Sequence, residues 1–261
     1  MDKQKVLNEA KGFYKEMNLL KDYPSRMRLA EKYYKGWYRD VAQLDLGKES
    51  GVSNPLLPTF FPGKTQNKSV YLFSPSISEI KLFSSKFKKV YFSAVPKLQG
   101  VFPTNSEQIH YNKDFELPGD KIKGLKVDFA FSHHVVEHIH PDDIKRHLEQ
   151  VYSLLKQGGA YLFVCPSSIR IKKDEKASNF FSKVSVYHHI GRYSYASILN
   201  LSKEIGFSKS SRPLINPNII NFFYEYRADP LYDYLKKSAF HIPDPLLSIL
   251  GISSLYILIT K

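Results

Sequence analysis

Cysteine is nearly absent from this chain of 261 residues, in which Cys165 is the single example. One thiol excludes an internal disulfide framework, and it excludes any metal site built from two or more cysteines of one chain. Such scarcity also fits a reducing compartment, so we expect a cytoplasmic protein.

Long hydrophobic runs are scarce as well. Charges are spread through the first residues, which contain no apolar core of a signal peptide, so we expect none. The long apolar run over residues 245–260 is shorter than the ~20 residues of a transmembrane helix and contains Gly251 and serines. We therefore expect no transmembrane segment and interpret residues 254–260 as a buried last strand.

Acidic residues are outnumbered, because 25 Asp and Glu stand against 38 Lys and Arg. The net charge of +13 and the isoelectric point near 9.5 would concentrate anionic partners around the protein. Nucleic acid is one such partner, but no RNA-binding motif or appended basic module is present, so we do not favour it. We expect an anionic small-molecule or glycan partner instead.

The N-terminal region predicts two amphipathic helices with a break near Pro24, since apolar residues recur there at helical spacing. A loop rich in Pro, Gly and Ser follows over residues 47–68. We therefore expect residues 1–65 to form a helical extension and residues 66–261 to form the main domain. The apolar positions are Val6, Ala10, Phe13, Met17 and Leu20, then Met27, Ala30, Tyr34, Trp37, Val41 and Leu44.

After residue 69, short β-branched and aromatic runs alternate with helical stretches, a pattern typical of a mostly parallel α/β sheet. Residues 127–131 and 160–164 are apolar almost throughout, as central strands covered on both faces should be. The predicted strands are 70–73, 90–92, 108–111, 127–131, 160–164 and 254–260.

The clearest helix is predicted over residues 141–155, ended by Gly158 and Gly159. Another helix is predicted over residues 194–205, and we expect residues 167–186 between them to form a basic polar loop.

Polar side chains follow the predicted strand that ends at Phe131. Ser132, His133, His134 and, a little later, His138 lie there. Because ligands bind outside the carboxyl ends of strands in an open parallel sheet, we expect these side chains at the functional edge.

The stretch from His134 to His138 also matches the H-x-x-E-H pattern of a zinc peptidase family. That motif needs a helix through both histidines and a third ligand downstream. Here it follows a buried strand and stops just before Pro141, so we expect no metal ion.

Residues 127–168 resemble the middle of class I S-adenosylmethionine-dependent methyltransferases. That family shows an aspartate opening the fourth strand, a Glu-His segment after it, a helix, and an "LKPGG" turn before the fifth strand. Asp128, the segment 136–139 and the turn 155–159 occupy these places, with Gln157 replacing the usual proline.

The resemblance continues downstream. His189, the pair Tyr193-Ser194 and the pair Gly206-Phe207 are similar to a later segment of the family, so the likeness covers roughly residues 68–261. It implies a doubly wound, seven-stranded, Rossmann-like sheet with the N-terminal helices lying over the ligand face.

The cofactor half of the pattern departs from the family. No glycine lies between Gly63 and Gly100, so the usual Gly-x-Gly turn after the first strand is missing. Ala94 stands where the family has a carboxylate for the cofactor ribose. We still expect S-adenosylmethionine as cofactor, with other residues supplying contacts. Those assigned to cofactor binding are Ser74, Ser76, Ser78, Asp114, Ser132 and His134.

The resemblance implies methyl transfer, and we predict O-methylation of a small-molecule or glycan acceptor. A histidine can take the proton of a hydroxyl acceptor because its usual pKa of ~6.5 lies near neutral pH. We expect His133 and His189 to do so, and we interpret His138 as structural. The residues assigned to acceptor binding are Arg170, Lys172, Lys173, His188 and Tyr193.

Two alternatives stay open. The basic residues after the fifth strand are also compatible with a solvated surface, as most lysine runs are. The chain is also compatible with a catalytically silent, methyltransferase-like scaffold whose basic face binds a partner, because both usual contacts to the cofactor are altered.

Overall fold

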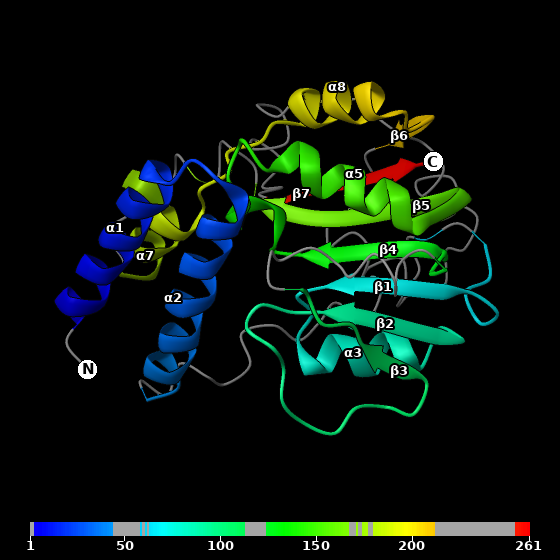
Figure 1. Ribbon diagram of the computed structural model, residues 1–261, viewed down its shortest axis with the longest axis horizontal. Helices are drawn as coiled ribbons and strands as arrows, with labels where there is room; N and C mark the ends of the chain where they lie inside the picture. The colour runs from blue at the N-terminus through cyan, green and yellow to red at the C-terminus, as the bar shows by residue number, and fades with distance from the viewer. Residues whose placement is uncertain are drawn as a thin grey trace, which may run out of the picture.

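Seven strands form the sheet at the centre of a computed structural model of the protein (Figure 1). They are β1 (Ser69–Phe73), β2 (Lys89–Ser93), β3 (Ser106–Gln108), β4 (Val127–His133), β5 (Leu155–Pro166), β6 (Lys209–Ser211) and β7 (Ser254–Thr260). The structure describes residues 3–43, 58, 61, 63–112, 124–166, 171, 174–176, 180–211 and 254–261.

The strand order is β3-β2-β1-β4-β5-β7-β6. Pairing is parallel from β3 through β5, whereas β7 pairs antiparallel with both β5 and β6. The strands β2 and β3 lie on one side of β1, whereas β4 and β5 lie on the other. The chain therefore changes direction across the sheet between β1 and β4, and ligands bind at such a switch point. The predicted doubly wound, mostly parallel sheet is confirmed.

Helices cover both faces of the sheet and one of its ends. Figure 1 shows α5 and α8 along one face, and it shows α1, α2 and α7 gathered at one end. The helices are α1 (Lys3–Leu19), α2 (Tyr23–Gln43), α3 (Ile77–Ser84), α5 (Ile144–Leu154), α7 (Phe180–His188) and α8 (Tyr195–Ile205), with a short 3-10 helix η2 (Val136–His138) after β4.

The core divides according to the alternation of side chains along each strand. In β1, Tyr71 and Phe73 join the apolar cluster that lies against α5 and α8. Val70 and Leu72 join the cluster that contains Phe83 of α3. Apolar side chains on both faces of a central strand explain its continuous hydrophobic run.

The N-terminal helices agree with the prediction of two amphipathic segments broken near Pro24. The apolar stripe of α1 is buried against α7 and α2, where Val6 and Ala10 meet Val184, and Phe13 and Met17 meet Ile190. None of the helices in the described ranges combines the length and hydrophobicity of a transmembrane span. The division at residue 65 stays a prediction.

The glycine pair does not end a helix, as the sequence pattern had suggested. The helix α5 stops at Leu154, and Gly158 and Gly159 lie inside the long strand β5. Gly158 has φ +73°, and a Cβ on Gly159 would lie 2.9 Å from the carbonyl oxygen of Asp128. Glycine is needed here because the strand bends against β4, which shows a register shift beside it.

Other boundaries also differ from the prediction. The strand β3 covers Ser106–Gln108 rather than 108–111, because its pairing with β2 ends at Phe92, whose carbonyl accepts a hydrogen bond from the Ile109 N–H. The expected basic loop contains the helix α7, and the short strand β6 had no counterpart in the prediction.

Candidate active site

A cleft of about 800 Å³, counting its part open to solvent, lies at the carboxyl ends of the parallel strands. Ser74 lines it after β1, Val95 after β2, Tyr111 after β3 and Val135 after β4. Residues that follow four neighbouring parallel strands therefore form one wall of this cleft.

The N-terminal helices form the opposite wall. Met17 lines the cleft from α1, and Arg26, Met27, Ala30 and Tyr34 line it from α2. The helical extension thus covers the functional edge of the sheet, where the resemblance had placed it.

The turn after β1 keeps a left-handed backbone without glycine. Ser74 has φ 45°, and its N–H donates a hydrogen bond of 2.7 Å to the carbonyl of Ser93 in β2. Non-glycine residues rarely adopt this region, and such strain concentrates at functional sites. His134 after β4 has φ 54°, so both turns at the switch point share the feature.

This turn yields a stability prediction. Ser74→Gly is expected to stabilise the fold by up to about 1 kcal/mol, since relief of left-handed strain exceeds the added freedom of the unfolded chain. Ser74→Val is expected to destabilise it by about 1 to 2 kcal/mol, because a β-branched residue fits the left-handed region worse. Urea unfolding of both variants measures the difference, and equal stabilities would contradict a strained turn.

The other serines assigned to the cofactor have structural partners. Ser76 caps α3: its side chain accepts a hydrogen bond from the Glu79 N–H, while the Glu79 carboxylate accepts one from the Ser76 N–H. The Ser78 hydroxyl lies 2.9 Å from that of Ser76. Ser132 is fully buried, with its hydroxyl 2.6 Å from that of Tyr161. Among these serines, Ser74 is the one in the lining of the cleft.

His133, the last residue of β4, and His134, which follows it, both face carboxylates. His133 Nδ1 lies 2.8 Å from Glu79 Oε1 at the start of α3, and His133 is not in the lining of the cleft. His134 Nδ1 lies 2.8 Å from Glu137 Oε1. Burial alone would lower the pKa of His134, but the hydrogen bond to Glu137 raises it above its usual value.

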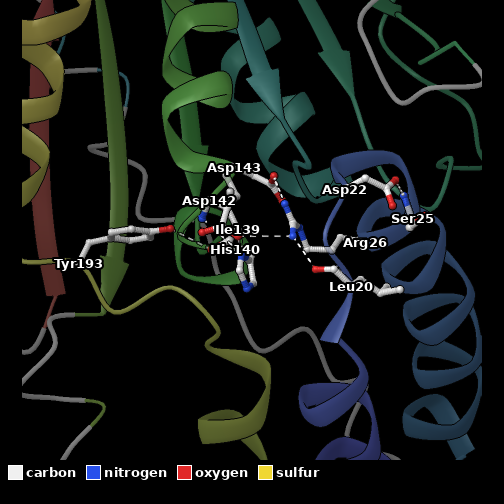
Figure 2. Close-up of polar contacts among 9 residues, drawn as sticks. All are labelled: Leu20, Asp22, Ser25, Arg26, Ile139, His140, Asp142, Asp143 and Tyr193. Atoms are coloured by element: carbon white, nitrogen blue, oxygen red, sulfur yellow. Dashed lines mark hydrogen bonds and ion pairs between the residues drawn. The ribbon is translucent and has the colours of Figure 1, made fainter. Parts of the chain in front are cut away.

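Residues assigned to the acceptor lie deeper than expected. His188 is buried among Phe13, Tyr33 and Trp37, with Nε2 2.7 Å from the Tyr33 hydroxyl. Burial lowers the pKa of His188 to about 3, so it is a neutral contact between α7 and α2. The buried Tyr193 hydroxyl donates to the Ile139 carbonyl at 2.9 Å, as Figure 2 shows.

His189 lies beside His138, with ring centroids 5.4 Å apart. His138 itself lines the cleft. Asp114, Arg170, Lys172 and Lys173 lie outside the described residues.

Asp128 lies at the opposite end of β4 from the cleft. Its carboxylate accepts hydrogen bonds from the Ser69 N–H and from the Lys156 ammonium. Burial would raise its pKa, but these bonds hold the pKa of Asp128 down at about 2. The family-like aspartate therefore ties β1, β4 and β5 together.

A buried ion pair on the cleft wall was missed by sequence reasoning. Figure 2 shows Arg26 of α2 facing Asp143 at the start of α5: Nε donates to Oδ2 at 2.6 Å and Nη2 to Oδ1 at 2.5 Å. Nη1 of Arg26 also donates to the Leu20 carbonyl at 2.7 Å. The pair fixes α2 over the sheet. No local pattern could reveal it, because its partners are 117 residues apart.

No family model matches the chain, and no curated protein matches it. Solved structures do. A Burkholderia thailandensis 1,6-didemethyltoxoflavin-N1-methyltransferase with bound S-adenosylhomocysteine is 11% identical over 93% of this chain and 91% of its own, with a TM-score of 0.53. A Haloferax volcanii methyltransferase complex with the Trm112 activator is 13% identical over 85% of this chain and 95% of the matched chain, with a TM-score of 0.51.

A Haemonchus contortus phosphoethanolamine N-methyltransferase 2 is 17% identical over 80% of this chain, with a TM-score of 0.48. This chain spans about half of that protein, 52% of its length. The likeness to the Burkholderia and Haloferax structures shows that the chain has the fold of class I S-adenosylmethionine-dependent methyltransferases.

Proposed function

We propose that this protein is an S-adenosylmethionine-dependent methyltransferase, and that residues 1–65 close the site of a domain formed by residues 66–261. The observation that carries the proposal is that the residues after β1, β2, β3 and β4 all line the same cleft. In a sheet with this strand order, these are the positions where a nucleotide-like ligand would bind.

The cleft fits the cofactor in its place at the carboxyl ends of the strands and in the shape of its first turn. When bound, S-adenosylmethionine supplies an electrophilic methyl group on a sulfonium ion. The left-handed turn at Ser74 would present its backbone to the ligand as a glycine turn does, and Val95 and Tyr111 would pack against its flat base. Ala94 stands in place of a carboxylate for the ribose, so we propose that Ser74 and Asp114 supply polar contacts.

We propose an oxygen acceptor, small-molecule or glycan and anionic, from the net charge of +13 and the histidines at the end of β4. The chain must mainly hold acceptor and methyl donor in line. His133 would take the acceptor proton. The acceptor itself would lie near Arg170, Lys172 and Lys173, which follow β5 in the sequence.

Calorimetry with S-adenosylmethionine and S-adenosylhomocysteine tests the proposal. We expect one molecule to bind per chain at concentrations up to millimolar. Ala30→Phe should weaken binding by about 10-fold or more, because Ala30 lines the cleft and about 1.4 kcal/mol corresponds to a factor of 10. Arg28→Phe, on an exposed position of the same helix, is the matched control and should leave affinity unchanged.

Absence of binding by the folded protein would refute the enzyme proposal. It would favour the scaffold alternative, for which the replaced carboxylate after β2 is the supporting observation. If the cofactor binds, His133→Ala should lower turnover far more than cofactor affinity, and equal losses in both would remove its role as base.

A further inference from the structure

Three potential metal ligands meet beside the cleft. Glu137 and His138 come from η2, and His189 follows α7; one ligand atom of each lies within 4.8 Å of the other two. The two segments approach closely because the Gly191 N–H donates to the Glu137 carbonyl at 2.8 Å. A Cβ on Gly191 would lie 2.7 Å from the Ile139 carbonyl oxygen, so glycine is required for this approach.

Two atoms of this group are buried without a hydrogen-bond partner among the described residues: Glu137 Oε2 and His189 Nδ1. The Glu137 side chain is 1% exposed, and its other oxygen is already bonded to His134. Buried polar atoms are nearly always paired, since an unpaired one costs roughly 1 to 3 kcal/mol and a charged one more. A cation between these atoms would satisfy both.

The tautomer of His138 leaves its other nitrogen available. Its Nδ1 lies 3.0 Å from the His188 carbonyl oxygen and 2.9 Å from the Tyr34 hydroxyl. The carbonyl can only accept, whereas the hydroxyl can accept or donate, so a proton on Nδ1 satisfies both contacts. The lone pair is then on Nε2. Histidines that bind metals usually donate their second ring N–H to a carbonyl or carboxylate in this way. His134 supports the Glu137 carboxylate similarly.

We propose that Glu137, His138 and His189 bind one divalent transition-metal ion, for which zinc is the best match. Two histidines and one glutamate form a known zinc ligand set that leaves a position open. Ligands about 2.1 Å from zinc in tetrahedral geometry lie about 3.5 Å apart, so the side chains close by about an ångström on binding. This set differs from the H-x-x-E-H reading of the sequence, because His134 is a supporting residue and His189 is the third ligand.

We place the open position toward the cleft, because His138 lines the cleft. There the ion holds an oxygen of an anionic or hydroxyl acceptor. That role rests on the proposed methyl transfer, whereas binding of the ion does not.

Titration of the chelator-treated full-length protein tests the site. We expect one Zn²⁺ per chain by calorimetry, a visible absorption band on adding Co²⁺, and no comparable binding of Mg²⁺, which prefers oxygen ligands. Glu137→Gln and His189→Gln should each weaken Zn²⁺ binding by about 100-fold or more, and His134→Gln by about 10- to 100-fold. The exposed His110→Gln is the control and should change nothing.

Zn²⁺ binding that survives both Glu137→Gln and His189→Gln overturns the proposal, as does a folded wild type that binds no Zn²⁺. If one variant fails to fold, the other decides. Anomalous diffraction from zinc-soaked crystals gives an independent answer, and a water at the site with no zinc peak also overturns it. Calorimetry with S-adenosylhomocysteine on the same samples reports the cofactor site separately, so either proposal can fail alone.

Discussion

Arg26→Met is expected to destabilise the fold by about 3 to 5 kcal/mol, because it leaves the Asp143 carboxylate buried without its partner. Arg26 is 3% exposed and Asp143 is 6% exposed, and two hydrogen bonds join them. Asp143→Asn should cost a similar amount by leaving the guanidinium unpaired. Neither effect involves helix capping, since the Asp143 side chain makes no capping bond to α5. Urea unfolding gives the free energies.

The double variant Arg26→Met with Asp143→Leu separates a lost charge pair from lost packing. Apolar replacements of similar volume often restore most of the stability that breaking a buried pair removes. We therefore expect the double variant to be more stable than either single one. Asp142→Asn is the matched control, because Asp142 is 68% exposed and 3.7 Å from Arg26, and it should change stability by less than about 1 kcal/mol. Additive losses in the double variant would contradict the coupling.

The sheet was predictable because its strands are short apolar runs of the right residue types. The run at Val127–Phe131 is buried from both sides, and burial on both faces is a local property of sequence. The helix α7 was not predictable in this way. Its interior serines and lysine suggested a loop, and it is stabilised where Val184 packs against Val6 and Ala10 of α1. Such tertiary packing outweighs weak local preference.

The candidate site was predictable in place but not in detail. Reading the residues after each strand located the edge that holds Ser74, Val135 and His138. The sequence did not predict that Ser76 caps α3 or that His133 contacts Glu79. Such contacts depend on the direction in which the chain turns after each strand. The absence of glycine indicated a changed turn, yet the backbone at Ser74 stays left-handed.

Acid is expected to remove about 2 to 3 kcal/mol of stability through His147 alone. Burial lowers the pKa of His147 to about 4, with Nε2 3.0 Å from the Tyr161 hydroxyl. Since the folded pKa lies below the unfolded value of ~6.5, the contribution is complete above about pH 6.5 and is lost as pH falls toward 4. The difference of about 2.5 pKa units between the folded and the unfolded state corresponds to about 3.4 kcal/mol. The expected loss is smaller than this, because His147 lines the cleft.

The variant His147→Gln isolates the pH-dependent stability that His147 contributes. It removes the titrating ring while Ser132 still bonds Tyr161, so its free energy of unfolding should fall less steeply than that of the wild type between pH 6.5 and 4. The difference in the free energy of unfolding between wild type and variant is therefore largest at pH 7, and it becomes smaller by about 2 kcal/mol at pH 4. An NMR titration of the His147 ring near pH 6.5 would contradict the buried neutral state, because a ring that protonates freely there adds no pH-dependent stability.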